Sequence, residues 1–170
     1  MAEELASRWD LDRGKDRFAG RIRQGRAGSP MPGAGRPPKV AVLCPQTYMN
    51  DAGRSVGPAR GSFKLPLDRV LVIHDEIDLP FGTLQLREGG GLAGHNGLKS
   101  IKQALGSADF MRLRVGVGRP DSSDPEVVSA HVLGRFAESE QQVRELVRGA
   151  ADEVERAVVG GAAPAEATSP

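Results

Sequence analysis

The stretch Arg69-Val70-Leu71-Val72-Ile73-His74-Asp75-Glu76 decides the fold. Its four consecutive valine, leucine and isoleucine residues predict a buried strand over residues 69–73. Polar residues follow at the carboxyl end of that strand, which is where ligands usually bind in an open α/β sheet.

Periodicity on either side of this strand predicts strands alternating with helices. Met111 to Val117 alternates apolar and polar residues as a strand does, and apolar residues recur at helical spacing over residues 138–159. Further predicted strands cover residues 18–26, 40–44 and 83–87, and further predicted helices cover residues 2–8, 51–63 and 97–105. This alternation is typical of a layered α/β domain.

Composition narrows the class of protein. The chain has 170 residues, 39% of them hydrophobic, which suits one domain with its own core. Its apolar runs are far shorter than the roughly 20 residues of a membrane helix, and acids stand where a signal peptide has bases. One cysteine and three scattered histidines show no metal-ligand spacing, so we expect a cytoplasmic protein without a metal.

Three polar clusters stand where predicted strands end or a loop meets a helix. They are Tyr48-Met49-Asn50, His74-Asp75-Glu76 and His95-Asn96. Asn50 (or Asp51) and Asn96 are equally explained as helix caps, a role that suits asparagine and aspartate. Three such clusters at successive strand ends favour a binding or catalytic site.

Single residues in these clusters have different interpretations. His74 directly follows apolar residues, so a hydrogen-bonded core histidine is the better interpretation. Asp75 can accept a hydrogen bond from an imidazole and fix its tautomer. Cys44 lies within a strand, so a buried, inert thiol is favoured.

Two further patterns concern phosphate. Gly89 to Gly94 matches G-x-G-x-x-G, but the acid expected about 20 residues later is missing, which weakens a dinucleotide site. Basic residues outnumber acidic ones before residue 119 and the reverse holds after it. Four basic residues could form either a phosphate-contacting patch or an ordinary solvated surface, and the sequence favours neither. They are Lys99, Lys102, Arg112 and Arg114.

The strings PQTYMN, HDEIDLPFGTLQLREGGGLAGHNGLKSI, FMRLRVGVGRP and HVLGRF resemble bacterial peptidyl-tRNA hydrolases in order and spacing. That family cleaves the ester between a peptide and the tRNA 3′ ribose, recycling tRNA during translation. The resemblance implies a cytoplasmic monomer without metal or cofactor, whose substrate is peptidyl-tRNA. It also implies a three-layer α/β domain with a mixed sheet over residues 1–159 and a disordered tail over 160–170.

The resemblance also implies roles for individual residues. Asp75 would orient and charge a catalytic histidine, and Asn50 and Asn96 would hold the attacking water and the substrate. Tyr48 and Met49 would line the pocket, with His95 and Lys99 toward the tRNA acceptor end.

The family's catalytic histidine stands in an Arg-His-Asn context, which none of His74, His95 and His131 shares. It lies, with the sheet's first central strand, in a segment before the family's first helix. Met1 falls inside that helix. We therefore expect a mis-assigned start codon, about 25 residues missing, and activity lower by about 10²–10⁴-fold for the chain as written.

Two other functions remain open from sequence. The first is a non-catalytic RNA-binding relative of the family, which retention of Asp75 argues against. The second is a nucleotide-binding oxidoreductase that uses the Gly89–Gly94 loop, for which no ribose-binding acid is found.

Overall fold

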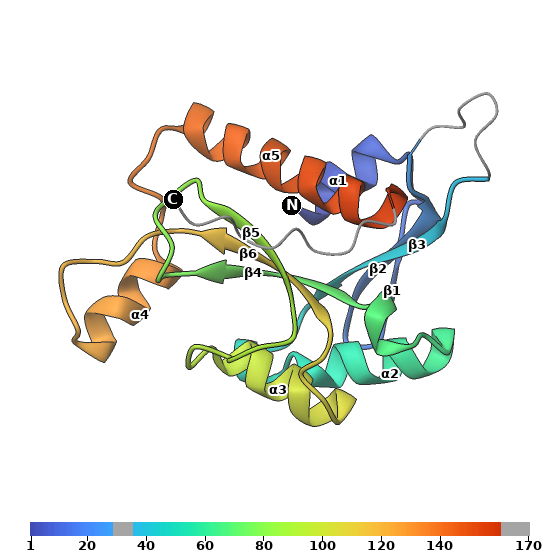
Figure 1. Cartoon of the computed structure of the whole chain (residues 1–170), viewed down its shortest axis with the longest axis horizontal. Coiled ribbons are helices and arrows are strands. Elements are labelled where there is room, and N and C mark those ends of the chain that lie inside the picture. The colour runs from blue at the N-terminus through green and yellow to red at the C-terminus, as the bar shows by residue number, and fades with distance from the viewer. Residues whose placement is uncertain (29–35, 161–170) are drawn as a thin grey trace.

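Strands form the central layer of the protein, with helices on both sides, in a computed structural model that describes residues 1–28 and 36–160. Figure 1 shows α1 (Ala2–Arg8) and α5 (Glu140–Val159) on one side of the strands. The opposite side carries α2 (Gly53–Phe63) and α3 (Asn96–Leu105), and α4 (Pro125–Leu133) lies at one end of the molecule. The predicted three-layer α/β fold is confirmed.

Within residues 1–28 and 36–160, the strands form two three-stranded sheets. The first is antiparallel and contains β1 (Lys15–Arg17), β2 (Gly20–Arg26) and β3 (Lys39–Pro45). The second has β6 (Met111–Gly116) at its centre, parallel to β4 (Leu71–Glu76) and antiparallel to β5 (Leu84–Glu88). The prediction of mixed strand directions is therefore confirmed, with the strands divided between two hydrogen-bonded sheets.

β4 begins and ends later than predicted. A short 3-10 turn, η2 (Leu67–Arg69), precedes it, and the strand continues to Glu76 because β6 pairs with its whole length. Asp75 stands opposite Val115 in that parallel register. The polar cluster after Ile73 therefore belongs to the strand itself, which holds its backbone rigidly.

Two predicted helix caps are wrong. The 3-10 turn η1 (Met49–Asp51) precedes α2, whose N-cap is Ala52, without a side-chain hydrogen bond. Asn50 and Asp51 therefore do not cap that helix. At α3 the N-cap is His95 rather than Asn96. β1 and α4 were not predicted at all.

Among the described residues, two apolar clusters lie on opposite sides of the strands (Figure 1). Leu113 packs with Ala150, Ala151 and Val154 of α5, as the helical spacing predicts. On the other side, Phe110 packs with buried residues of α3, namely Leu98, Ile101 and Leu105. Each such buried leucine or valine contributes about 1.5–3 kcal/mol.

One prediction falls partly outside the described residues, namely the disordered tail over 160–170, of which 161–170 are not described. Within the described ranges, no helix is both long and apolar enough to cross a bilayer.

Candidate active site

Asp75 and His95 form the centre of the candidate site. His95 Nε2 lies 3.4 Å from Asp75 Oδ1, although twenty residues separate them in sequence. The side chains are 14% (His95) and 30% (Asp75) exposed, so the pair is shielded yet reachable from solvent. The hydrogen bond from His95 is the main reason that the pKa of the Asp75 carboxyl lies below its usual value, which keeps the carboxylate ionised at neutral pH.

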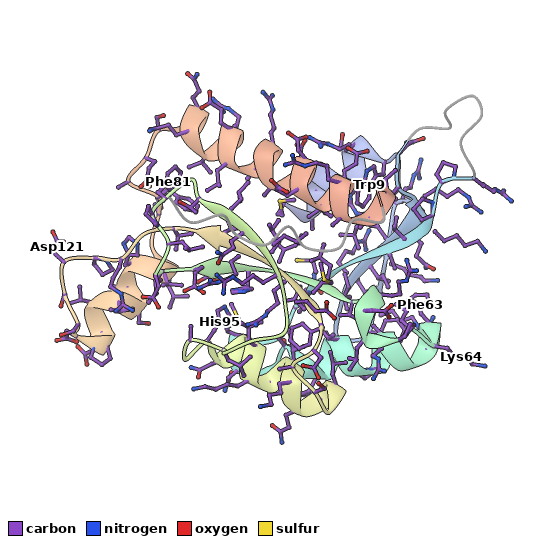
Figure 2. All side chains as sticks on the ribbon, viewed as in Figure 1. Trp9, Phe63, Lys64, Phe81, His95 and Asp121 are labelled. Carbon is purple, nitrogen blue, oxygen red and sulfur yellow. The ribbon has the colours of Figure 1, made fainter. Side chains whose placement is uncertain are left out.

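The start of α3 places His95 against β4. The imidazole Nδ1 accepts the backbone N–H of Leu98 at 3.3 Å, which caps the helix. Figure 2 shows His95 at the start of α3, on the side that faces the strands. The next residue, Asn96, begins the helix, so the same helix end carries both residues of the predicted third cluster.

His74 is a buried neighbour of this pair. Its ring meets the His95 ring edge to face, with centroids 5.1 Å apart. Its Nδ1 lies 2.7 Å from the Asp75 carbonyl oxygen, while its buried Nε2 has no partner among the described residues. Burial lowers the pKa of His74, so the ring is neutral at pH 7. The core interpretation of His74 is right, except that one nitrogen is unsatisfied.

The first predicted cluster, Tyr48-Met49-Asn50, lies close to the third. The 3-10 turn η1, which contains Met49 and Asn50, packs against α3. The sulfur of Met49 comes so close to Gly97 that a Cβ there would lie 2.6 Å from it. Tyr48 is 85% exposed and Met49 is 55% exposed, and Asn50 is also exposed. The η1 turn therefore offers an aromatic, a thioether and an amide next to the start of α3.

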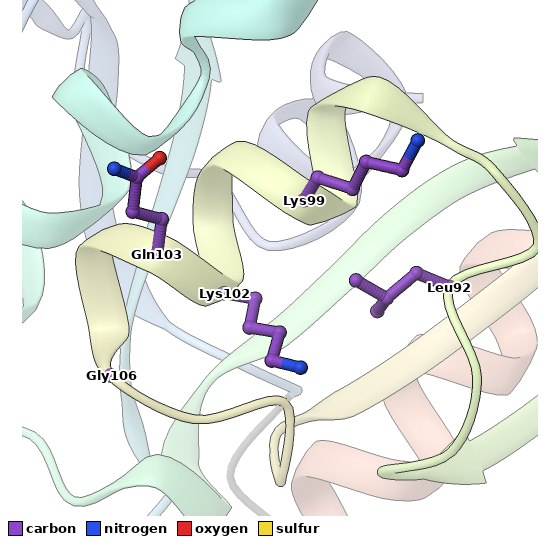
Figure 3. Close-up of a pocket in the computed structure, with 5 residues that line it drawn as sticks. All are labelled: Leu92, Lys99, Lys102, Gln103 and Gly106. Carbon is purple, nitrogen blue, oxygen red and sulfur yellow. The ribbon is translucent and has the colours of Figure 1, made fainter.

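A basic pocket lies farther along α3. Figure 3 shows Lys99, Lys102 and Leu92 around it. Its volume is about 410 Å³, and Gln103 and Gly106 complete the lining. Lys99 thus lies on the same helix as His95, one turn later, and faces this pocket.

The four basic residues Lys99, Lys102, Arg112 and Arg114 do not share one surface, so they form neither a common phosphate-contacting patch nor a common solvated face. Arg112 is only 3% exposed and donates to the Gly91 carbonyl at 2.8 Å. Arg114 is bound by Glu76, with its Nε 3.0 Å and its Nη2 2.9 Å from the same carboxylate oxygen. Lys99 and Lys102 remain at the pocket, whereas both arginines support the sheet from within.

Two remaining residues lie elsewhere. His131 meets the carbonyl oxygens of Val117 and Gly118 from α4, at 3.3 and 3.1 Å. Cys44 is exposed, so its predicted burial is wrong. In the part of the chain that the structure describes, no group of three or more histidine, cysteine or acidic residues is arranged to hold a metal ion.

These features define an α/β protein with a carboxylate–imidazole pair where the carboxyl end of a parallel strand meets a helix start. The model of the peptidyl-tRNA hydrolase family matches residues 1–169. The chain therefore belongs to the peptidyl-tRNA hydrolase family.

Individual relatives agree with this assignment. The chain is 43% identical over 137 residues to a peptidyl-tRNA hydrolase of Acidiphilium cryptum, covering 81% of this chain and 66% of the relative. A peptidyl-tRNA hydrolase of Trichlorobacter lovleyi is 47% identical, with 72% and 63% covered. The alignments thus span just under two thirds of these relatives' length. The crystal structure of peptidyl-tRNA hydrolase from Acinetobacter baumannii superposes with a TM-score of 0.75 at 33% identity, covering 94% of this chain and 76% of that one.

Proposed function

We propose that the protein hydrolyses the ester bond between peptide and tRNA in peptidyl-tRNA, and so recycles tRNA for translation. Membership of the family supports the reaction class. The observation that carries the proposal is the ionised Asp75 held against the His95 imidazole, beside the exposed η1 turn. As further parts of the proposal, the protein acts as a cytoplasmic monomer without metal or cofactor.

The proposed reaction is attack of water on the ester carbonyl. Asp75 Oδ2, or an imidazole that Asp75 orients, takes a proton from the water, the tetrahedral intermediate collapses, and the tRNA 3′ oxygen leaves and receives that proton. Asp75 stabilises positive charge that develops on an imidazole. Amide N–H groups of Asn50 and Asn96 donate to the water or to the carbonyl oxygen, where negative charge develops.

Binding of the two ends of the substrate is divided between two surfaces. Tyr48 and Met49, which are both exposed, contact the peptidyl part. Lys99, which faces the basic pocket on α3, contacts the tRNA near its acceptor end. His95 lies toward the tRNA acceptor end, and its ring also contacts the Asp75 carboxylate.

The test is cleavage of an N-acetylaminoacyl-tRNA by the full 170-residue chain, followed by release of the labelled N-acetylamino acid. We expect turnover that falls by about 10²-fold or more in Asp75→Asn, as loss of a group that supports acid–base catalysis does. Asp78→Asn is the matched control, because this substitution removes the same charge three residues away. Asp78 makes an exposed ion pair with Arg119 at 2.6 Å. Binding of tRNA without cleavage would instead favour the non-catalytic RNA-binding relative.

A further inference from the structure

Both ring nitrogens of His95 are occupied. Nδ1 receives the N–H of Leu98 at 3.3 Å, and Nε2 faces Asp75 Oδ1 at 3.4 Å. A backbone N–H can only donate, so Nδ1 must carry a lone pair. The ring proton therefore sits on Nε2 and points to the carboxylate.

This arrangement has a consequence for proton transfer. A general base needs a lone pair that a water molecule can reach. In His95 the only lone pair is used by the helix cap, and the other nitrogen carries the proton. A second proton at Nδ1 would face the Leu98 N–H and remove the cap, because two donors cannot share a hydrogen bond.

The charged groups around the ring do not change this assignment. From β4 the ring meets Asp75 and the neutral His74, and Glu76 on the same strand is engaged by Arg114. From the η1 turn, the Met49 sulfur lies against Gly97, and the acid of that turn, Asp51, lies 3.6 Å from Arg54. On α3 itself, Lys99 faces the basic pocket.

We propose that His95 is a positioning residue, an Nε2–H donor that fixes the Asp75 carboxylate relative to the start of α3, and that it is not the general base. This inference rests on the proposed ester hydrolysis. It assigns to His95 the task of holding Oδ1, which leaves Oδ2 to accept from the attacking water or from a further imidazole. It also couples Asp75 to Asn96, since one helix end sets the position of both.

Two substitutions separate the two hydrogen bonds of His95. Asparagine is among the best N-cap residues, so His95→Asn keeps the cap but is too short to reach Asp75. Glutamine is longer and its amide donates without carrying a basic nitrogen, so His95→Gln restores a donor to Asp75. His131→Gln is the matched control, since His131 lies on α4 and its Nε2 meets the carbonyl oxygens of Val117 and Gly118 rather than Asp75.

Cleavage of N-acetylaminoacyl-tRNA by these variants gives the first readout. We expect kcat to fall by about 10²-fold in His95→Asn with little change in KM, as a displaced catalytic group does. In His95→Gln we expect kcat to recover at least tenfold relative to His95→Asn, with the pH profile of the wild type. Equal loss in both variants, together with disappearance of the acid limb, would show that His95 is the base and would overturn the proposal.

The second readout does not depend on turnover. A long-range ¹H–¹⁵N spectrum of the ¹⁵N-histidine-labelled protein reports the tautomer of each ring, and His95→Asn assigns the signal. We expect His95 to carry its proton on Nε2 at pH 7, and the Asp75 carboxyl pKa to rise in His95→Asn. A proton on Nδ1 would refute the arrangement. If the wild type cleaved no ester, the proposed hydrolysis would fail, whereas this spectrum would still decide the role of His95.

Discussion

Glu76 is the carboxylate on which the buried basic face of the second sheet depends. Arg112 and Arg114 lie two residues apart on β6, on one face, and Arg87 of β5 stands opposite Arg112. Arg114 makes two contacts with Glu76 Oε2, at 3.0 and 2.9 Å, and also donates to Gln85. In the described ranges no carboxylate pairs with Arg112, whose pKa is lowered by burial and by the neighbouring arginines.

Replacing Glu76 by glutamine keeps the shape of the side chain and removes its charge. The Glu76 side chain is 5% exposed and that of Arg114 is 18% exposed, so the cation left behind is poorly solvated. Breaking a buried ion pair at one partner costs about 3–5 kcal/mol. For a chain of this length each kcal/mol lowers Tm by about 2–4 °C, so we expect a fall of roughly 6–20 °C.

Urea unfolding followed by circular dichroism measures this loss. Glu140→Gln is the matched control, because Glu140 pairs with Arg144 at 3.0 Å on the surface of α5, where such pairs contribute less than about 1 kcal/mol. Adding Arg114→Met to Glu76→Gln should restore part of the stability, since it removes the uncompensated cation. A loss below about 1 kcal/mol in Glu76→Gln, or no rescue in the double variant, would refute this account of the buried face.

Two further outcomes follow from close packing and from burial. A Cβ at Gly53 would lie 2.3 Å from the Ser100 carbonyl oxygen, so Gly53→Ala should destabilise the protein by about 1–3 kcal/mol in urea unfolding. Gly61→Ala in the same helix is the control. Its Cβ would meet nothing within 4 Å, so this change should be neutral or stabilising. Burial lowers the pKa of His74 in the folded protein. As the pH falls below about 6.5, this histidine therefore takes up a proton in the unfolded chain before it does so in the folded protein, and the free energy of unfolding decreases. Thermal unfolding at pH 7.5 and 5.5 should show a smaller loss in His74→Asn than in the wild type, and an equal loss would contradict this.

The longer elements could be predicted because their patterns reflect burial directly. The apolar spacing of α5 matches the face that packs on Leu113 of β6, and that of α3 matches the face that packs on Phe110. Ser139 with Gln142 forms a capping box at the start of α5. β1 was not predicted because the two residues that connect it to β2 are not ones that favour a turn. Phe18 and Ala19 both adopt left-handed φ angles, 58° and 48°, and the buried Ser55 hydroxyl donates to the Ala19 carbonyl at 2.8 Å. A contact from a distant helix thus holds a turn that local sequence does not favour.

α4 was missed for a different reason. Its residues show no apolar stripe, and none of them is buried, so the periodicity that identifies other helices is lacking. A local signal was present: Asp124 accepts the N–H of Glu126 at 2.8 Å, and Pro125 stands at the first helical position. Cap chemistry, rather than periodicity, could have found this helix.

The candidate site could be predicted in its parts but not in its contacts. The clusters containing Asn50, Asp75 and Asn96 were singled out because they stand at predicted strand and helix ends. The contact between Asp75 and His95 could not be predicted, because it depends on where α3 packs relative to β4. A histidine also caps α3, a position where Asn96 was the stronger expectation from cap preferences.

The error over Arg112 and Arg114 explains how the site is supported. Alternation of apolar and basic residues along β6 suggested one solvated face, but Arg112 is 3% exposed and the Arg114 side chain is 18% exposed, so each of these cations needs a partner within the layer. Glu76 supplies it for Arg114, and its other oxygen, Oε1, accepts the backbone N–H of Asp78 at 3.2 Å. The Glu76 side chain therefore holds Arg114 of β6 with one oxygen and the Asp78 backbone with the other, and so fixes the end of β4. Asp75 immediately precedes Glu76, so loss of this pair should loosen the carboxylate that His95 holds as well as the sheet.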